Sequence, residues 1–217
     1  MRYVLYILLL SGLLIAGCQS GPTPAEQIYV HLEQAVELEQ DFEDQQDPMV
    51  KLEQEEKAIY DQIITLGMKE IDKIKELSTE ASVIVDERKE RLEKERESIL
   101  KSKEEFSKVE EIVTNIEEEE LRELANQLTQ LMANRYESYE KLYNAYSTSI
   151  TLDKELYELF QQEDLTMDQL ESHIEKINDS YEEVITLNEM FNEITTNYNA
   201  AKKEFYTAAG LEVTYEE

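Results

Sequence analysis

Apolar residues recur along most of this chain at intervals of three and four, which is the spacing of one side of an α-helix. Four stretches show this pattern, at about 24–44, 47–114, 121–162 and 167–209. In the last stretch the apolar side is the most regular. It includes Ile177, Tyr181, Val184, Phe191 and Ile194. We expect these five residues to be buried in one continuous seam rather than to line a ligand pocket.

The second stretch contains a seven-residue repeat. Its apolar positions are Val85, Leu92, Ile99, Phe106 and Val113. A strict period of seven predicts a left-handed coiled coil. With no firm stop signal before residue 114, it predicts one helix of about 65 residues, ~100 Å long at 1.5 Å per residue.

Half of the seam in this long helix is polar. The positions three residues after the apolar ones are Arg88, Glu95 and Ser102. This arm, residues 86–105, therefore either packs loosely or projects beyond its partners. We interpret it as the candidate surface for a protein partner and as the least stable part of the molecule. A merely solvated charged helix is the alternative.

Turn-forming residues mark the ends of these stretches and are otherwise scarce. Thr23-Pro24-Ala25-Glu26 and Thr166-Met167-Asp168-Gln169 are capping-box patterns, Asp47-Pro48 is a helix start signal, and Gly210 suits a C-terminal cap. Between Pro24 and Gly210 there is one proline and one glycine, Gly67. The chain is thus predicted to be all-α, an elongated antiparallel bundle or coiled coil of about four helices over 24–210, followed by a tail at 211–217.

The first residues form a different kind of segment. Arg2 precedes an apolar run, residues 3–15, that ends in Ile15-Ala16-Gly17-Cys18. Such a run predicts a signal peptide over 1–17, because it is shorter than the ~20 residues of a membrane span. Cys18 is the only cysteine of the chain. An ordinary signal peptide with an incidental cysteine is the alternative to the interpretation that follows.

A branched aliphatic residue, two small residues and a cysteine resemble the lipobox of bacterial lipoproteins. The resemblance implies that the Cys18 sulfur carries a diacylglyceryl group and that cleavage after Gly17 makes Cys18 the N-terminus. Residues 18–23 would then be a lipidated tether. Two acyl chains hold a protein stably on a bilayer. We therefore expect the protein on the extracytoplasmic face of the plasma membrane.

The charge of the chain restricts its partners. The formal net charge is −29, and loss of residues 1–17, which contain Arg2 and no acid, leaves −30. Such acidity argues against nucleic acid, which is bound by cations that neutralise phosphates. It argues equally against direct contact with anionic headgroups or teichoic acid, so a partner at those surfaces would be basic or bridged by divalent cations.

No pattern of catalytic, cofactor-binding or metal-ligating residues stands out, and we expect no cofactor. Residues Ile28 and Leu170 stand three positions before His31 and His173, so the Glu-x-x-His motif of di-metal bundles is absent. The acidic run at 117–120 lacks the alternating ligands and turn glycine of a calcium loop, and we interpret it as a helix start. The sequence also has no Gly-x-Ser-x-Gly elbow.

Tyrosine is abundant, with 13 residues and no tryptophan. Tyr136, Tyr139, Tyr143 and Tyr146 follow one another at intervals of three and four. They are either a ridge that stacks on sugar rings or, as we prefer, aromatic residues that fill the seam of the bundle with their hydroxyls at its edge.

Together these features resemble the YkyA-type cell-wall-binding lipoproteins of Gram-positive bacteria. The resemblance rests on the Cys18 lipobox, the prolines at 24 and 48, the tyrosine-rich third helix and the closing segment 202–206. It implies an exported lipoprotein on the outer leaflet, beneath the cell wall, without catalytic residues. Our hypothesis is a helical spacer, scaffold or wall-proximal adaptor that contacts cell-wall components or a protein partner. A solute-binding lipoprotein of a transporter and a wall-active enzyme are the alternatives.

Overall fold

The structure is a computed structural model that describes residues 21–66 and 70–211. The predicted signal peptide, Cys18 and residues 212–217 of the tail lie outside the described residues. Five helices make up the described part: α1 (Pro24–Leu38), α2 (Gln40–Ile63), α3 (Ile71–Val113), α4 (Glu119–Leu159) and α5 (Met167–Ala208). No strand occurs among these residues. The prediction of an all-α fold is confirmed.

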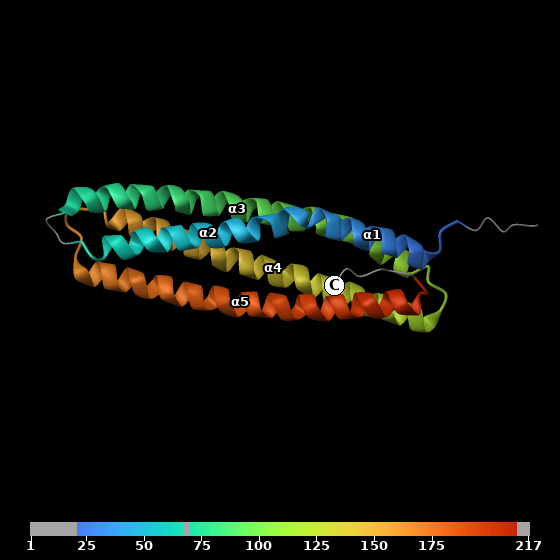
Figure 1. The fold of residues 1–217 in the computed structure, drawn as a ribbon. Helices are drawn as coiled ribbons and strands as arrows, with labels where there is room; N and C mark the ends of the chain where they lie inside the picture. Colours follow the sequence, from blue (N-terminus) through green and yellow to red (C-terminus); the bar gives the residue numbers. More distant parts are fainter. Residues whose placement is uncertain (1–20, 67–69, 212–217) are drawn as a thin grey trace, which may run out of the picture.

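The helices form a long rod (Figure 1). Helices α1 and α2 follow one another in the same direction, with only Glu39 between them, and both pack along α3. Helix α3 packs on α4, and α4 on α5, so that each long segment runs antiparallel to the next. The 43 residues of α3 give the rod a length of ~65 Å at 1.5 Å per residue.

The boundaries of the first helices differ from those that the sequence predicted. Helix α1 ends at Leu38 rather than near residue 44, and Pro48 lies inside α2 instead of starting a helix. The predicted helix of about 65 residues is wrong. The chain leaves α2 at Ile63 and enters α3 at Ile71, and the two helices pack against each other. The apolar spacing continued through Gly67, so the pattern concealed the turn.

The helix caps are as the sequence predicted. Thr23 and Glu26 exchange both capping-box hydrogen bonds, and Thr166 and Gln169 do the same at the start of α5. Gly210, just after α5, has a φ of 69°, a left-handed conformation that glycine adopts without strain.

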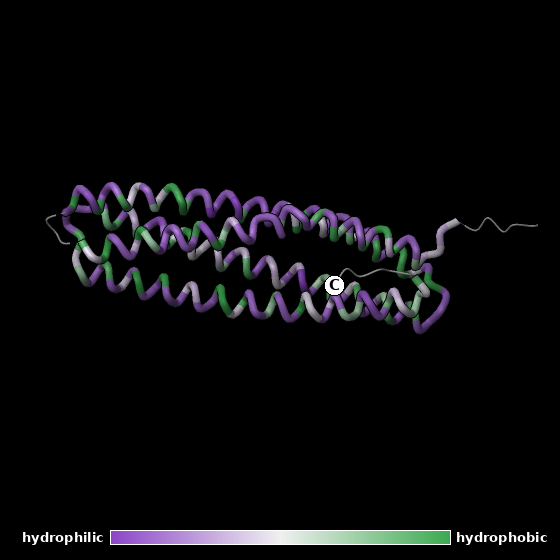
Figure 2. Tube along the Cα trace, in the orientation of Figure 1, coloured by the Kyte–Doolittle hydropathy of each residue, from purple (hydrophilic) through white to green (hydrophobic). Residues whose placement is uncertain are grey.

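The apolar core falls into two clusters. One, at the end of the rod where α1 begins, joins α1 to the second half of α3, the first half of α4 and the second half of α5. The other joins α2, the first half of α3 and the second half of α4. All five residues of the seven-residue repeat are at most 4% exposed. Figure 2 shows the hydrophobic residues recurring at intervals along largely hydrophilic helices, as expected for amphipathic packing.

Helix α5 is packed unevenly along its length. Its buried residues in the second half are Phe191, Tyr198, Ala201, Phe205 and Tyr206, whereas the first half buries only His173 and Ser180. Ile174 and Ile177 are half-buried beside the second cluster. The first half of α5 is therefore covered by α4 on one side and left open toward α2.

Candidate functional site

A groove runs between α2 and α5, with α3 and α4 beneath it. It consists of two hollows of about 820 and 440 Å³ that share Glu53, Tyr146, Val184 and Asn188 in their linings, so they are continuous. The larger hollow extends to Tyr60 and Ile174, in the half of the rod remote from the start of α1. The smaller extends to Phe42 and Phe191, near the middle. Both volumes lie in the range of roughly 300–1,000 Å³ that small-molecule binding sites occupy.

A buried cation forms the floor of the larger hollow. Arg88 of α3 is 1% exposed, and its Nη1 donates to Glu56 Oε2 of α2 at 2.5 Å and to Asp153 Oδ2 of α4 at 2.8 Å. Its Nη2 donates to the hydroxyls of Tyr146 and Tyr181, at 3.2 and 2.9 Å. Four helices therefore meet at one guanidinium. A buried charge is tolerated when it is paired and hydrogen-bonded in this way.

Two glutamates of the groove, one in each hollow, have raised pKa values. Burial raises the pKa of Glu56 to about 7, although Arg88 opposes the shift. Burial also raises the pKa of Glu95 to about 8, and the negative charge of Glu53 adds to that effect. Gln46 Nε2 donates to Glu95 Oε1 at 2.9 Å. The groove thus contains carboxyl groups whose pKa values lie above the ordinary range of a glutamate.

The polar seam of residues 86–105 has a different role from the one predicted. Arg88, Glu95 and Ser102 are 1%, 6% and 0% exposed and face the interior of the bundle. Ser102 Oγ donates to Glu39 Oε1 at 2.7 Å and lies 2.9 Å from Tyr136 Oη. The prediction of a loose or projecting arm that offers these positions to a partner is wrong. These polar residues bind polar residues of the other helices.

A second paired cation lies beside the smaller hollow. Arg135 of α4 donates from Nη1 and Nη2 to the two carboxylate oxygens of Glu39, at 2.8 and 2.6 Å. Its Nε donates to Thr195 Oγ1 of α5 at 3.0 Å. This bidentate pair links α4 to the α1–α2 junction. Arg135 therefore has one partner at that junction, Glu39, and another on α5, Thr195.

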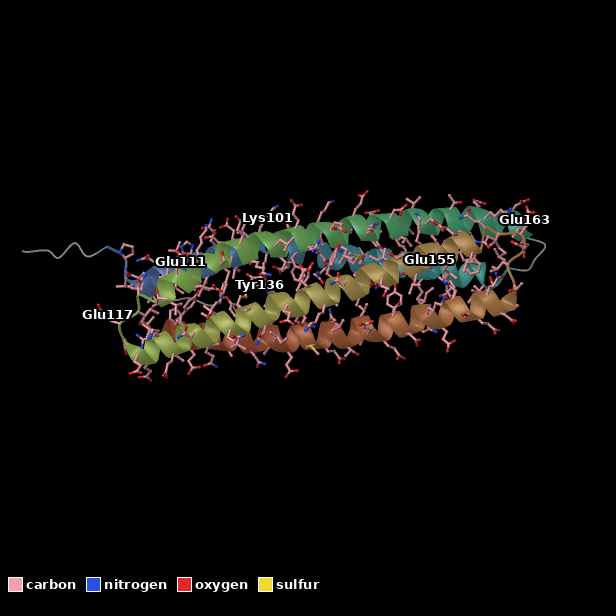
Figure 3. The ribbon with its side chains drawn as sticks, turned by 180° about the vertical axis from the view of Figure 1, so that it is seen from behind. Lys101, Glu111, Glu117, Tyr136, Glu155 and Glu163 are labelled. Atoms are coloured by element: carbon pink, nitrogen blue, oxygen red, sulfur yellow. The ribbon has the colours of Figure 1, made fainter. Side chains whose placement is uncertain are left out.

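The tyrosine series of α4 divides between core and groove. Tyr136 and Tyr139 are 3% and 1% exposed, and Figure 3 shows Tyr136 between α3 and α4 while Lys101 and Glu163 point outward. Tyr143 and Tyr146 are half-buried and line the groove. Tyr136 fills the bundle as we preferred, Tyr139 is buried at the base of the smaller hollow, and Tyr143 and Tyr146 belong to a concave surface.

The apolar side of α5 does not form the closed seam that its periodicity predicted. Phe191 is buried, but Ile177, Tyr181 and Val184 are half-buried and line the groove. Periodicity shows which side of a helix is apolar, but not whether another helix covers that side. The groove was missed for this reason.

The sequence did contain a signal for the buried network. Glu56 lies among the apolar positions Leu52, Ile59 and Ile63 of α2, and Asp153 lies between Ile150 and Tyr157 of α4. The sequence places two acids and one arginine at seam positions of three different helices. Their opposite charges could have predicted that they pair.

The part of the chain that the structure describes contains neither a cluster of metal ligands nor a helix that could span a membrane. His31 Nδ1 lies 2.6 Å from Glu105 Oε1, and His173 Nε2 lies 2.8 Å from the carbonyl oxygen of Leu152. Over residues 21–66 and 70–211, no three potential metal ligands gather. Within the same residues, no helix combines the length and apolar character needed to cross a membrane.

This chain is similar to known proteins in sequence and in fold. Residues 23–208 match a family described as "Putative cell-wall binding lipoprotein". The chain is 36% identical over 202 residues to a Bacillus subtilis protein named "Uncharacterized lipoprotein YkyA", across 93% of this chain and 90% of that protein. A crystal structure of a conserved Staphylococcus aureus protein of unknown function superposes with a TM-score of 0.74. That likeness covers 86% of this chain and 97% of the other at 16% identity, so it concerns the fold alone. By its sequence, this chain belongs to the YkyA family of lipoproteins.

Proposed function

We propose that this protein is a non-catalytic, extracytoplasmic binding lipoprotein that connects the plasma membrane to the cell wall. A lipid on Cys18 holds the N-terminal end of the rod at the outer leaflet, and residues 18–23 are the tether. The groove between α2 and α5 contacts a wall component. The family description and the name of the B. subtilis relative support the lipoprotein and wall-binding parts.

One observation carries the proposal: the groove is remote from the end that would be anchored. Glu53 follows Pro24 by 29 residues of nearly continuous helix, so it lies ~45 Å along the rod at 1.5 Å per residue. A rod standing on its tether would present the groove well above the lipid headgroups. An enzyme or a transporter's solute-binding protein has no evident need of such a spacer.

The anchor is tested by Cys18→Ala. We expect the variant to leave the membrane fraction and to accumulate as uncleaved precursor or in the medium, because the acyl chains that hold it are missing. Fractionation and labelling with a lipid probe measure this. Unchanged membrane retention together with unchanged labelling refutes lipidation at Cys18.

Wall binding is tested by sedimenting the purified chain, without residues 1–17, with insoluble cell wall. We expect saturable co-sedimentation that survives moderate salt, because an acidic protein cannot bind the wall by charge attraction to its anionic polymers. A protein that stays in the supernatant at every wall concentration contradicts the proposal.

A further inference from the structure

The groove described above follows from sparse contact between two helices. Helix α2 packs on α3 and helix α5 on α4, whereas α2 and α5 touch through the rings of Phe42 and Phe191, 6.1 Å apart, and otherwise flank the hollows with few direct contacts. From Phe42 to Tyr60 the groove extends along 18 residues of α2, ~27 Å. Its shape is that of a trough for an extended ligand.

The polar floor of the trough opposes occupation by a partner's helix. Arg88 with Glu56 and Asp153, and Gln46 with Glu95, lie along it. The buried members of this set are already paired, but Gln46 is exposed and Glu53 is half-buried beside them. An amphipathic helix would lay an apolar face on these two hydrated groups and remove their water, which is costly. A ligand rich in hydroxyl groups replaces that water with hydrogen bonds.

The charges of the trough oppose an anionic ligand. Three cations line the described part: Lys57, Arg88 and Arg135. Each is already paired, Lys57 with Asp61 at 2.7 Å, Arg88 with Glu56 and Asp153, and Arg135 with Glu39. An anion would have to displace a carboxylate, and it would meet Glu53 and Glu189 on the walls.

The walls combine fixed aromatic rings with exposed amides. Tyr181 donates to Asp153 Oδ2 at 2.5 Å, and Tyr146 donates to Glu53, so both hydroxyls are held in place while the rings line the trough. On α5, Asn178 and Asn188 are exposed along the rim. Amide groups both donate and accept hydrogen bonds, and aromatic rings pack on the apolar C–H faces of sugars.

We propose that the trough between α2 and α5 binds an uncharged, acetamido-bearing glycan chain. The tyrosine rings pack on the sugar faces, and Asn178, Asn188 and Glu53 hydrogen-bond the hydroxyl and acetamido groups. This inference rests on the proposed function and names the ligand of its groove.

The test uses purified protein and a soluble hexamer of β-1,4-linked N-acetylglucosamine. Calorimetric titration is expected to give saturable binding to one site. The double variant N178A/N188A should weaken it at least tenfold, because both amides are exposed and contribute to binding rather than to the core. The matched control N197A/N199A changes two exposed asparagines of α5 that lie outside the groove, and it should bind as the unchanged protein does.

Other outcomes overturn the proposal. The proposal fails if the hexamer shows no saturable binding, or if the groove variant and the control variant lose affinity for it equally. Preferential binding of a polyanion such as polyglutamate, or of a basic amphipathic peptide, assigns the trough to another class of ligand. If the hexamer does not bind but the protein still sediments with insoluble wall, wall attachment stands and only the groove assignment fails. If N178A/N188A abolishes both activities, the groove is the wall-binding site.

Discussion

At the scale of single residues, the centre of this molecule is a guanidinium that serves four helices. Burial alone lowers the pKa of Arg88. The hydroxyls of Tyr146 and Tyr181 and the carboxylates of Glu56 and Asp153 raise it by more than burial lowers it, so Arg88 keeps its charge. Such networks add little net stability compared with an apolar core, but breaking one of them is expensive. The network also sets the position of the tyrosines in the groove.

Replacement of Arg88 by methionine should lower the free energy of unfolding by about 3–5 kcal/mol, since two buried carboxylates lose their counterion. Urea denaturation followed by circular dichroism measures this. Arg91→Met on the same helix is the control: Arg91 is half-buried, pairs with the exposed Glu87 and donates to Gln45 Oε1, and its loss should cost only about 1 kcal/mol. Adding Glu56→Gln and Asp153→Asn to the Arg88 variant should recover much of the loss. Equal costs at 88 and 91 contradict this account.

Glu95 should make the protein less stable as the pH rises. Its folded pKa of about 8 lies above the ordinary 4.5, because burial and the charge of Glu53 disfavour the ionised form. Below pH 4.5 Glu95 is protonated in both the folded and the unfolded chain. As the pH rises from 4.5 toward 8, only the unfolded chain ionises readily, so the free energy of unfolding falls. Glu95→Gln keeps a neutral group beside Gln46. The variant should equal the unchanged protein near pH 5 and exceed it near pH 8.5, by an amount of order 3 kcal/mol.

The control for this pH profile is Glu97→Gln, which changes an exposed acid of the same helix. Thermal denaturation across pH 5–9 compares the three proteins. Parallel profiles for the unchanged protein and the Glu95 variant would show that Glu95 titrates at an ordinary pH.

At the scale of helices, the division between α1 and α2 is made by a side chain of α3. Ser98 is 1% exposed; its Oγ donates to the carbonyl oxygen of Leu38 at 2.6 Å and accepts from the N–H of Phe42 at 3.2 Å. In a continuous helix those two backbone groups would bond to each other. Insertion of a side chain between them is a known cause of helix kinks. The kink brings Glu39 to Arg135.

Ser98→Ala should destabilise the protein by about 1–3 kcal/mol, because the N–H of Phe42 and the carbonyl oxygen of Leu38 lose their shared partner and can bond to each other only if the helix straightens and Glu39 shifts on Arg135. Ser107→Ala is the matched control, since its exposed hydroxyl bonds only to the carbonyl oxygen of Glu104 in its own helix. Chemical denaturation gives both values. If the two substitutions cost the same, the junction does not depend on Ser98.

At the scale of the whole molecule, excess negative charge opposes a fold that has no disulfide to support it. The formal net charge of −29 is spread over a rod, and repulsion between exposed carboxylates weakens as salt screens it. The rod should therefore become more stable as the ionic strength rises.

We expect the melting temperature to rise by several degrees between roughly 10 and 150 mM salt, over which the Debye length falls from about 30 to 8 Å. Differential scanning calorimetry measures this. Replacing Glu117, Glu118, Glu119 and Glu120 by glutamine removes four charges and should reduce the salt dependence. A melting temperature that falls with salt would mean that attractive ion pairs dominate.

Much of this architecture could be predicted from the pattern of residues. The capping boxes at Thr23 and Thr166, the cap at Gly210 and the repeat from Val85 to Val113 are local signals, and the fold class follows from them. The turn after Ile63 was missed because the apolar spacing continues across it. The partners of Arg88 were missed because Glu56 and Asp153 lie 32 and 65 positions away in the chain.

The groove was beyond prediction for a related reason. An apolar side of α5 is visible in the sequence, but whether a neighbour covers it depends on the angle and spacing of four helices. Ile177 and Val184 follow the same pattern as Phe191, yet only Phe191 is buried. The difference arises from packing between segments that are more than 100 residues apart.

The open side between α2 and α5 also bears on how quickly the chain reaches its native state. Each long helix packs chiefly on the one before or after it in sequence, and α2 and α5, whose packing would close a loop of more than 100 residues, make few direct contacts. Chains with mostly local contacts fold in microseconds to milliseconds, because little loop entropy is lost before contacts form. We expect refolding on that timescale, with a single kinetic phase for the half of the rod that contains the groove.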